Sequence, residues 1–149
     1  MKLEFAFTLF GSLKPAVEMG AGPFGKRRYF EVMDGKVAGD RLNGKVLAGG
    51  GDWLLVGPDG FARLDVRIQI VTDDGASIYA HYEGLLELNR KVAEAVASGV
   101  STDYGDQYFR TTPRLETGDA RYAWLNQSLF VAEGRLHPGA VEYRVHRIA

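Results

Sequence analysis

The chain has 149 residues, enough for a single domain with its own core, and its 46% hydrophobic and 25% charged content is ordinary for a globular protein. Eighteen basic and 19 acidic residues give a formal net charge of −1, which argues against nucleic acid or an anionic membrane as the main partner. The chain has no cysteine, so disulfides, thiolate catalysis and cysteine metal sites are excluded.

The first segment, MKLEFAFTLFGSL, has the apolar character of either a strand or a secretion signal. Glu4 interrupts its apolar run, and no small-residue cleavage site follows directly, so we predict a first β-strand. No later stretch approaches the length of a membrane span. We therefore expect a cytoplasmic protein with one domain over residues 1–149.

Most of the chain consists of short segments that are typical of β-strands and that turn signals separate. The expected strands are 3–10, 27–33, 45–48, 52–56, 61–72, 76–87, 106–112, 121–133 and 140–148. The main turn signals are Asp34-Gly35, Asn43-Gly44, Pro58-Asp59-Gly60, Asp73-Asp74-Gly75 and Pro138-Gly139.

One short helix interrupts the strands. Asn89 is a suitable N-cap, Val92, Ala93 and Val96 lie on one side, and Gly99 is a suitable stop. We expect this helix to cover one end of the sheet. Eight or more strands, with turns about every ten residues, indicate a sandwich or a closed barrel.

Two strands show a strict alternation whose polar side is unusual. Residues 61–72 place Asp65 and Arg67 opposite Val66 and Ile68, and other strands continue the polar row. The row comprises Asp65, Arg67, Tyr79, His81, Tyr108, Arg110, Trp124 and Asn126. These residue types recognise ligands by forked hydrogen bonds, stacking and proton transfer, whereas a solvated face usually carries Lys, Glu, Ser and Thr.

Periodicity does not say which face is inside, so the polar row either lines a barrel lumen or faces solvent. If it lines the lumen, the aliphatic row faces outward. The helix, loops or a second copy of the chain must then cover that row, since large apolar patches are rarely left exposed. The lumen interpretation therefore predicts a homo-oligomer.

Five separated pieces of the chain, in order, resemble domain of unknown function family 3237, also called uncharacterised protein family 0311. The pieces are Gly50 with Asp52-Trp53, Leu64-Asp65 with Arg67, Thr72 with Asp74-Gly75, Tyr108 to Pro113, and Trp124 to Asn126. The Gly-Ala pair usual before Asp-Trp is Gly50-Gly51 here. The resemblance implies one antiparallel β-barrel, lipocalin-like or allene-oxide-cyclase-like, without a settled reaction. Because the family's Asp, Arg, Tyr and Asn positions fall on the polar row, it favours the lumen interpretation.

Charged residues of the row suggest two roles each. Arg67 and Arg110 would clamp a ligand carboxylate, or one of them would pair structurally with Asp65. Asp65 would act as a general base if burial raises its pKa, or would orient Arg67 if the two pair. Asp52 follows three glycines and either caps backbone amides or faces the pocket.

Aromatic residues of the row also have two interpretations. Tyr79 and Tyr108 would donate hydrogen bonds or protons, or would simply pack along the wall. His81 is a candidate proton carrier or a structural histidine. Trp53 and Trp124 would stack on an aromatic ligand or fill the barrel end.

Other motifs fail. GAGPFG at 20–25 lacks the following helix that would bind a pyrophosphate. His81 and Glu83 share a face, but the sequence shows no third metal ligand, so we expect no metal and no cofactor. We predict a cofactor-independent lyase or isomerase, performing decarboxylation, elimination, hydration or cyclisation on a small aromatic organic acid in the lumen. The alternatives are a non-catalytic carrier or sensor, and a structural module with a filled barrel.

Overall fold

The computed structural model describes residues Met1–Ala149 and consists mainly of antiparallel strands. The strands are β1 (Leu3–Leu13), β2 (Val17–Gly22), β3 (Gly25–Gly39), β4 (Gly44–Val46), β5 (Gly51–Val56), β6 (Phe61–Thr72), β7 (Ser77–Glu87), β8 (Phe109–Thr111), β9 (Arg114–Glu116), β10 (Leu129–His137) and β11 (Ala140–Ile148). The helices are α1 (Arg90–Ser98), the 3₁₀ turn η1 (Ala120–Tyr122) and α2 (Ala123–Asn126). α1 is the longest of them and is far too short to cross a membrane.

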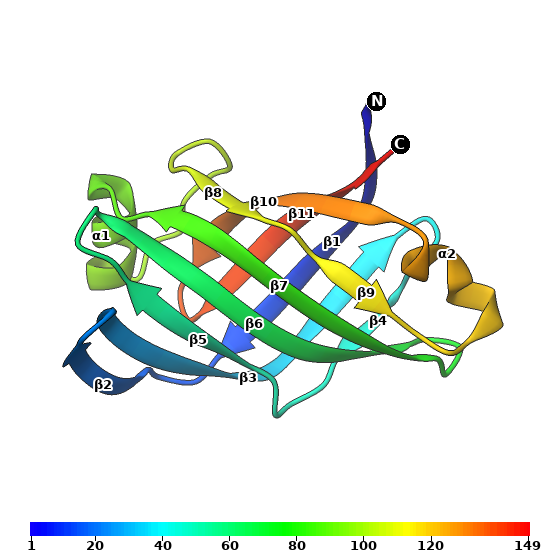
Figure 1. Ribbon diagram of the computed structural model, residues 1–149, viewed down its shortest axis with the longest axis horizontal. Helices are drawn as coiled ribbons and strands as arrows, with labels where there is room; N and C mark the ends of the chain where they lie inside the picture. Colours follow the sequence, from blue (N-terminus) through cyan, green and yellow to red (C-terminus); the bar gives the residue numbers. More distant parts are fainter.

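The strands close into a barrel with eight positions (Figure 1). Its order is β6-β5-β3-β1-β11-β10-β8-β7, and pairing between β6 and β7 closes the ring. β4 lies between β3 and β6 beyond the end of β5, and β9 continues along β7 beyond β8. β2 pairs only with β3. The predicted closed antiparallel barrel with one short cover helix is confirmed.

The interior of the barrel is aliphatic, which reverses the expected orientation of the alternating rows. Val66 and Ile68 are 3% and 4% exposed, whereas half of the Arg67 side chain is accessible to solvent. An eight-stranded barrel has room for little more than its own inward side chains, so burial of the aliphatic row drives closure. The prediction that the polar row lines the lumen is wrong. With the aliphatic row inside, the argument for a covering second copy no longer holds.

The half of the barrel near α2 is densely packed. Its fully buried side chains come from several strands, from α2 and from the connection between β3 and β4. They are Phe7, Val37, Leu42, Ile70, Ile78, Leu125 and Val145. Burial of each of these side chains stabilises the folded state by about 1.5–3 kcal/mol. This half therefore supplies much of the free energy that holds the barrel together.

Three expected local structures differ. The expected strand 106–112 is limited to β8 (Phe109–Thr111). The segment 121–133 is a strand only from Leu129, because η1 and α2 occupy its first part. Asp34-Gly35 is not a turn, since β3 runs through it to Gly39. A Cβ on Gly35 would lie 2.1 Å from the carbonyl oxygen of Phe10, so this glycine permits close backbone approach rather than a bend.

The predicted limits of the helix are confirmed, but its predicted side is not, because Val92 is buried whereas Ala93 and Val96 are exposed. Asn89 accepts a hydrogen bond from the backbone N–H of Val92 at 3.0 Å, and Gly99 ends α1 in the left-handed conformation. The buried side of α1 presents Val92 and Ala95 to the barrel. Figure 1 shows α1 at one end of the barrel and α2 at the other.

Candidate functional site

A cavity of about 450 Å³ occupies the half of the barrel next to α1. Its walls are mostly apolar and come from the inward faces of the barrel strands, and α1 contributes Val92, Ala95 and Val96 at the end. None of the seven fully buried residues of the packed half lines this cavity, whereas the fully buried Phe109 on β8 does. The barrel is therefore filled at one end and hollow at the other. The hollow volume is within the range of small-molecule sites.

Three polar side chains from well-separated strands converge in this apolar interior. Asp52 comes from β5, Tyr82 from β7 and Tyr143 from β11, and all three line the cavity. The rings of Tyr82 and Tyr143 meet edge to face with centroids 5.4 Å apart, and Tyr143 makes a similar contact with Phe109 at 5.3 Å. These contacts hold both phenol rings in place inside the barrel.

The local backbone explains how Asp52 comes to face inward. It lies opposite Phe30 on β3 and Val66 on β6, and residues that pair directly share a face. Before it, Gly51 leaves space for the Tyr29 ring, because a Cβ there would lie 2.4 Å from that ring. The Asp52 carboxylate accepts a hydrogen bond from the backbone N–H of Asp65 at 3.0 Å. Both interpretations of Asp52 from the sequence therefore hold, as amide partner and as cavity residue.

The electrostatics of the cavity favour proton exchange. Burial raises the pKa of Asp52 from 3.8 to about 6, the hydrogen bond from Asp65 opposes this rise, and the negative charge of Asp65 adds to it. Burial also raises the pKa of Tyr82 and of Tyr143 well above their usual value. Near neutral pH the cavity thus combines a carboxylate that readily accepts a proton with two phenols that keep theirs.

Basic side chains lie only where the cavity approaches solvent, and each already pairs with a glutamate. The pairs are Lys14–Glu31, Arg28–Glu18 and His137–Glu142. The deep part of the cavity has no cationic side chain among its lining residues. A negatively charged group of a ligand would have no positively charged partner there.

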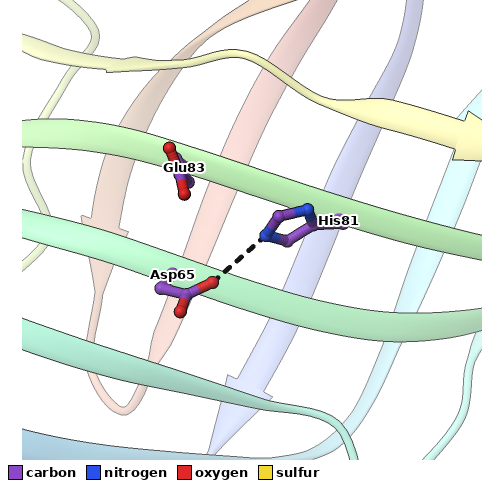
Figure 2. Close-up of side chains that lie close together, drawn as sticks. All are labelled: Asp65, His81 and Glu83. Atoms are coloured by element: carbon purple, nitrogen blue, oxygen red, sulfur yellow. Dashed lines mark hydrogen bonds and ion pairs between the residues drawn. The ribbon is translucent and has the colours of Figure 1, made fainter.

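Most of the residues predicted as a lumen site lie together on the outer face of the barrel. Asp65 pairs with the Arg67 guanidinium at 3.5 Å. It also pairs with His81 Nε2 at 3.1 Å, as Figure 2 shows. The structural pairing of Asp65 and Arg67, one of the two predicted alternatives, is present. His81, for which the sequence showed no partner, has one in Asp65.

The aromatic and arginine candidates of this face are also outside the lumen. Trp53 packs on Tyr29 with ring centroids 5.0 Å apart. The Tyr79 side chain, on β7, is exposed. The Arg110 guanidinium lies over the exposed Tyr108 ring at 5.1 Å and donates a hydrogen bond to a main-chain carbonyl. These contacts are those of surface side chains that shield a sheet.

Trp124 and Asn126 belong to α2 rather than to a strand. The half-buried Trp124 packs against Phe130, so it takes the alternative role of filling the barrel end. Asn126 accepts a hydrogen bond from the backbone N–H of Thr117 and donates one to its carbonyl, both at 2.9 Å. Neither residue lines the cavity next to α1.

Sequence reasoning missed Tyr82 and Tyr143. Each was hidden in an apolar row, Tyr82 in line with Ile78 and Ala80. A hydroxyl within an otherwise aliphatic row was the available signal, because a buried phenol needs a polar partner or a ligand.

Comparison with known proteins places the chain in a family. Residues 1–148 match the model described as protein of unknown function DUF3237. A UPF0311 protein from Clostridium acetobutylicum is 38% identical over 84% of this chain and 79% of its own length. A crystal structure of a conserved protein of unknown function from Rhodopseudomonas palustris has 31% identity and a TM-score of 0.91, covering 100% of this chain and 99% of that one.

A more distant structure supports the fold alone. It is described as an enzyme from Penicillium herquei, has 21% identity and a TM-score of 0.73, and the match covers 99% of this chain and 94% of that one. The five sequence motifs, the closed barrel and the match across the whole chain agree. The chain belongs to the DUF3237 family, whose curated members carry the name UPF0311.

Proposed function

We propose that the protein binds a small, largely apolar and partly aromatic molecule in the cavity next to α1, and that Asp52 exchanges a proton with it. The observation that carries the proposal is the convergence of one carboxyl and two phenols in an otherwise apolar hollow. Such a hollow with a few convergent polar groups and a perturbed carboxyl is typical of an active site. An acidic group on the ligand fits only at the mouth, near Lys14 and Arg28.

The chemistry is acid–base catalysis without a cofactor. Asp52 removes a proton from an acidic C–H or O–H of the ligand, and the electron pair left behind moves onto a ligand oxygen. Tyr82 and Tyr143 donate hydrogen bonds to that oxygen and stabilise its charge. Asp52 then returns the proton to a different atom, which gives an isomerisation or a cyclisation with no net loss of atoms.

Two further considerations bear on this choice. The barrel fold is compatible with catalysis, since the Penicillium herquei protein of similar fold is described as an enzyme. The second candidate is a carrier with the same pocket, favoured by the predominance of apolar lining residues. A carrier would bind ligands without moving their protons.

Exchange of an acidic C–H with solvent deuterium tests catalysis directly. The probe is 2-tetralone, an aromatic ketone with acidic hydrogens, followed by NMR, and 8-anilinonaphthalene-1-sulfonate fluorescence reports occupancy of the cavity. We expect the wild-type protein to accelerate exchange, and Asp52→Asn to lose this acceleration while still binding the fluorescent probe. Asp73→Asn, in an exposed turn, is the matched control and should behave as wild type.

The outcomes separate the two functions. Binding of both probes with no accelerated exchange identifies a carrier. Accelerated exchange that survives Asp52→Asn removes the proposed role of this carboxyl. Tyr143→Phe should slow exchange by about 10²-fold or more if its hydroxyl stabilises the oxyanion.

A further inference from the structure

The outer face of β6 and β7 holds a cluster that the lumen does not use. Asp65, His81 and Glu83 each present one potential ligand atom, and these three atoms lie within 4.8 Å of one another. Figure 2 shows the three side chains on the same side of the two strands. Sequence reasoning found only His81 and Glu83, because Asp65 comes from the neighbouring strand.

Strand geometry holds the three groups together. His81 and Glu83 are two residues apart on β7 and therefore share a face, and Asp65 pairs directly with Glu83 across the ladder. The distance of 3.1 Å between His81 Nε2 and Asp65 Oδ1 matches the separation of about 3.3 Å expected between two ligands of a tetrahedral zinc ion. A small movement of the exposed Glu83 side chain completes a three-ligand set with room for water.

A second observation concerns the placement of the two carboxylates of the cluster. Two carboxylates directly opposite each other on neighbouring strands repel and destabilise the pair. Asp65 and Glu83 occupy such positions. A cation between them would convert this repulsion into shared coordination.

The surroundings select the kind of cation. The Arg67 guanidinium lies 3.5 Å from the Asp65 carboxylate, and Arg114 on β9 occupies the position opposite His81 in the ladder. These two positive charges offset the two carboxylates, so attraction for any passing cation is weak. Binding must therefore come from coordination by the imidazole, which favours Zn²⁺ or Co²⁺ over Ca²⁺ or Mg²⁺.

We propose that Asp65, His81 and Glu83 form a surface site for one zinc-like divalent ion, separate from the lumen. The imidazole supplies the nitrogen ligand and the two carboxylates supply oxygen ligands, with water in the remaining positions. Metal binding displaces the Arg67 guanidinium from Asp65.

Calorimetric titration of the full chain with Zn²⁺ and with Ca²⁺ tests the site. We expect one Zn²⁺ per chain and no measurable Ca²⁺ binding. His81→Ala and Glu83→Gln should each weaken Zn²⁺ binding at least tenfold, as loss of a ligand costs no less than loss of its hydrogen-bond partner. His146→Ala, which removes a half-buried histidine on β11, and Glu116→Gln, on the exposed edge strand β9, are controls and should bind like wild type.

Two further measurements distinguish loss of the metal ligands from a general loss of folded structure. Arg67→Gln should tighten Zn²⁺ binding by up to about fivefold, because a competing ion pair of this exposed kind is weak. Co²⁺ should broaden the amide NMR signals around residues 65, 81 and 83 first. Unchanged binding in His81→Ala and Glu83→Gln, broadening centred elsewhere, or no Zn²⁺ binding by the wild type would each overturn the proposal and leave a surface ion-pair cluster.

Discussion

Replacing Asp52 with asparagine should stabilise the protein, and the gain should depend on pH. The carboxyl has a pKa of 3.8 in an unfolded chain and about 6 in the cavity, because burial disfavours its charged form. One pKa unit corresponds to about 1.4 kcal/mol, so ionised Asp52 costs the folded state about 3 kcal/mol. Asparagine keeps an oxygen for the Asp65 N–H but buries its own amide donors, which lowers the expected net gain to about 1–3 kcal/mol.

The direction of the pH dependence follows from the linkage between proton binding and folding. The folded-state pKa is above the unfolded one, so the folded protein binds the proton more tightly and is most stable, with respect to this group, below about pH 4. The stability contributed by the protonated form is lost as pH rises through about 6. The advantage of Asp52→Asn should therefore be small at pH 4, about half developed at pH 5, and complete at pH 7 and above.

Urea unfolding at each pH, in buffer with a metal chelator, measures the difference in free energy of unfolding. Asp73→Asn provides the comparison, because this carboxyl lies in an exposed turn. An advantage of Asp52→Asn that is the same at pH 4 and pH 8, or a loss of stability at pH 8, would refute the assignment of Asp52 as a buried carboxyl with a raised pKa.

Four further substitutions test the fold in three comparisons. Gly35→Ala should lower the free energy of unfolding by about 1–3 kcal/mol in chemical denaturation, since its Cβ would collide with the Phe10 carbonyl; an unchanged midpoint would disprove the close approach. Leu42→Ala, in the packed half, should cost about 2–5 kcal/mol, and more than Leu64→Ala beside the existing cavity; equal losses would contradict the division into filled and hollow halves. Asn89→Ala should remove the cap of α1 and cost about 1 kcal/mol by thermal unfolding, and faster amide exchange confined to α1 is the expected accompaniment.

Local chemistry was the predictable part of the fold. The strand limits 61–72 and 140–148 agree closely with β6 and β11, because turn residues bracket clear alternations. The helix ends at Asn89 and Gly99 were equally predictable, because these residue types commonly cap helices. Where glycine serves close packing instead of a turn, as at Gly35, the sequence is ambiguous, since the contact depends on a strand far away in the chain.

The site was less accessible to sequence reasoning, for a physical reason. The alternation repeats every two residues but does not tell which face of the strand is buried. The same pattern therefore describes Val66 inside with Arg67 outside, or the reverse. The recognition-type residues of the polar row pointed to the wrong choice. Only the closure of the barrel shows that Asp52, Tyr82 and Tyr143 meet, because their strands are not neighbours in the ring.

The division of the barrel into a filled and a hollow half has a kinetic consequence. The packed half near α2 closes that end of the barrel, so a ligand of the cavity must enter and leave at the other end. A converted molecule would block its successor until it departs, and inhibition by product should then be strictly competitive with substrate.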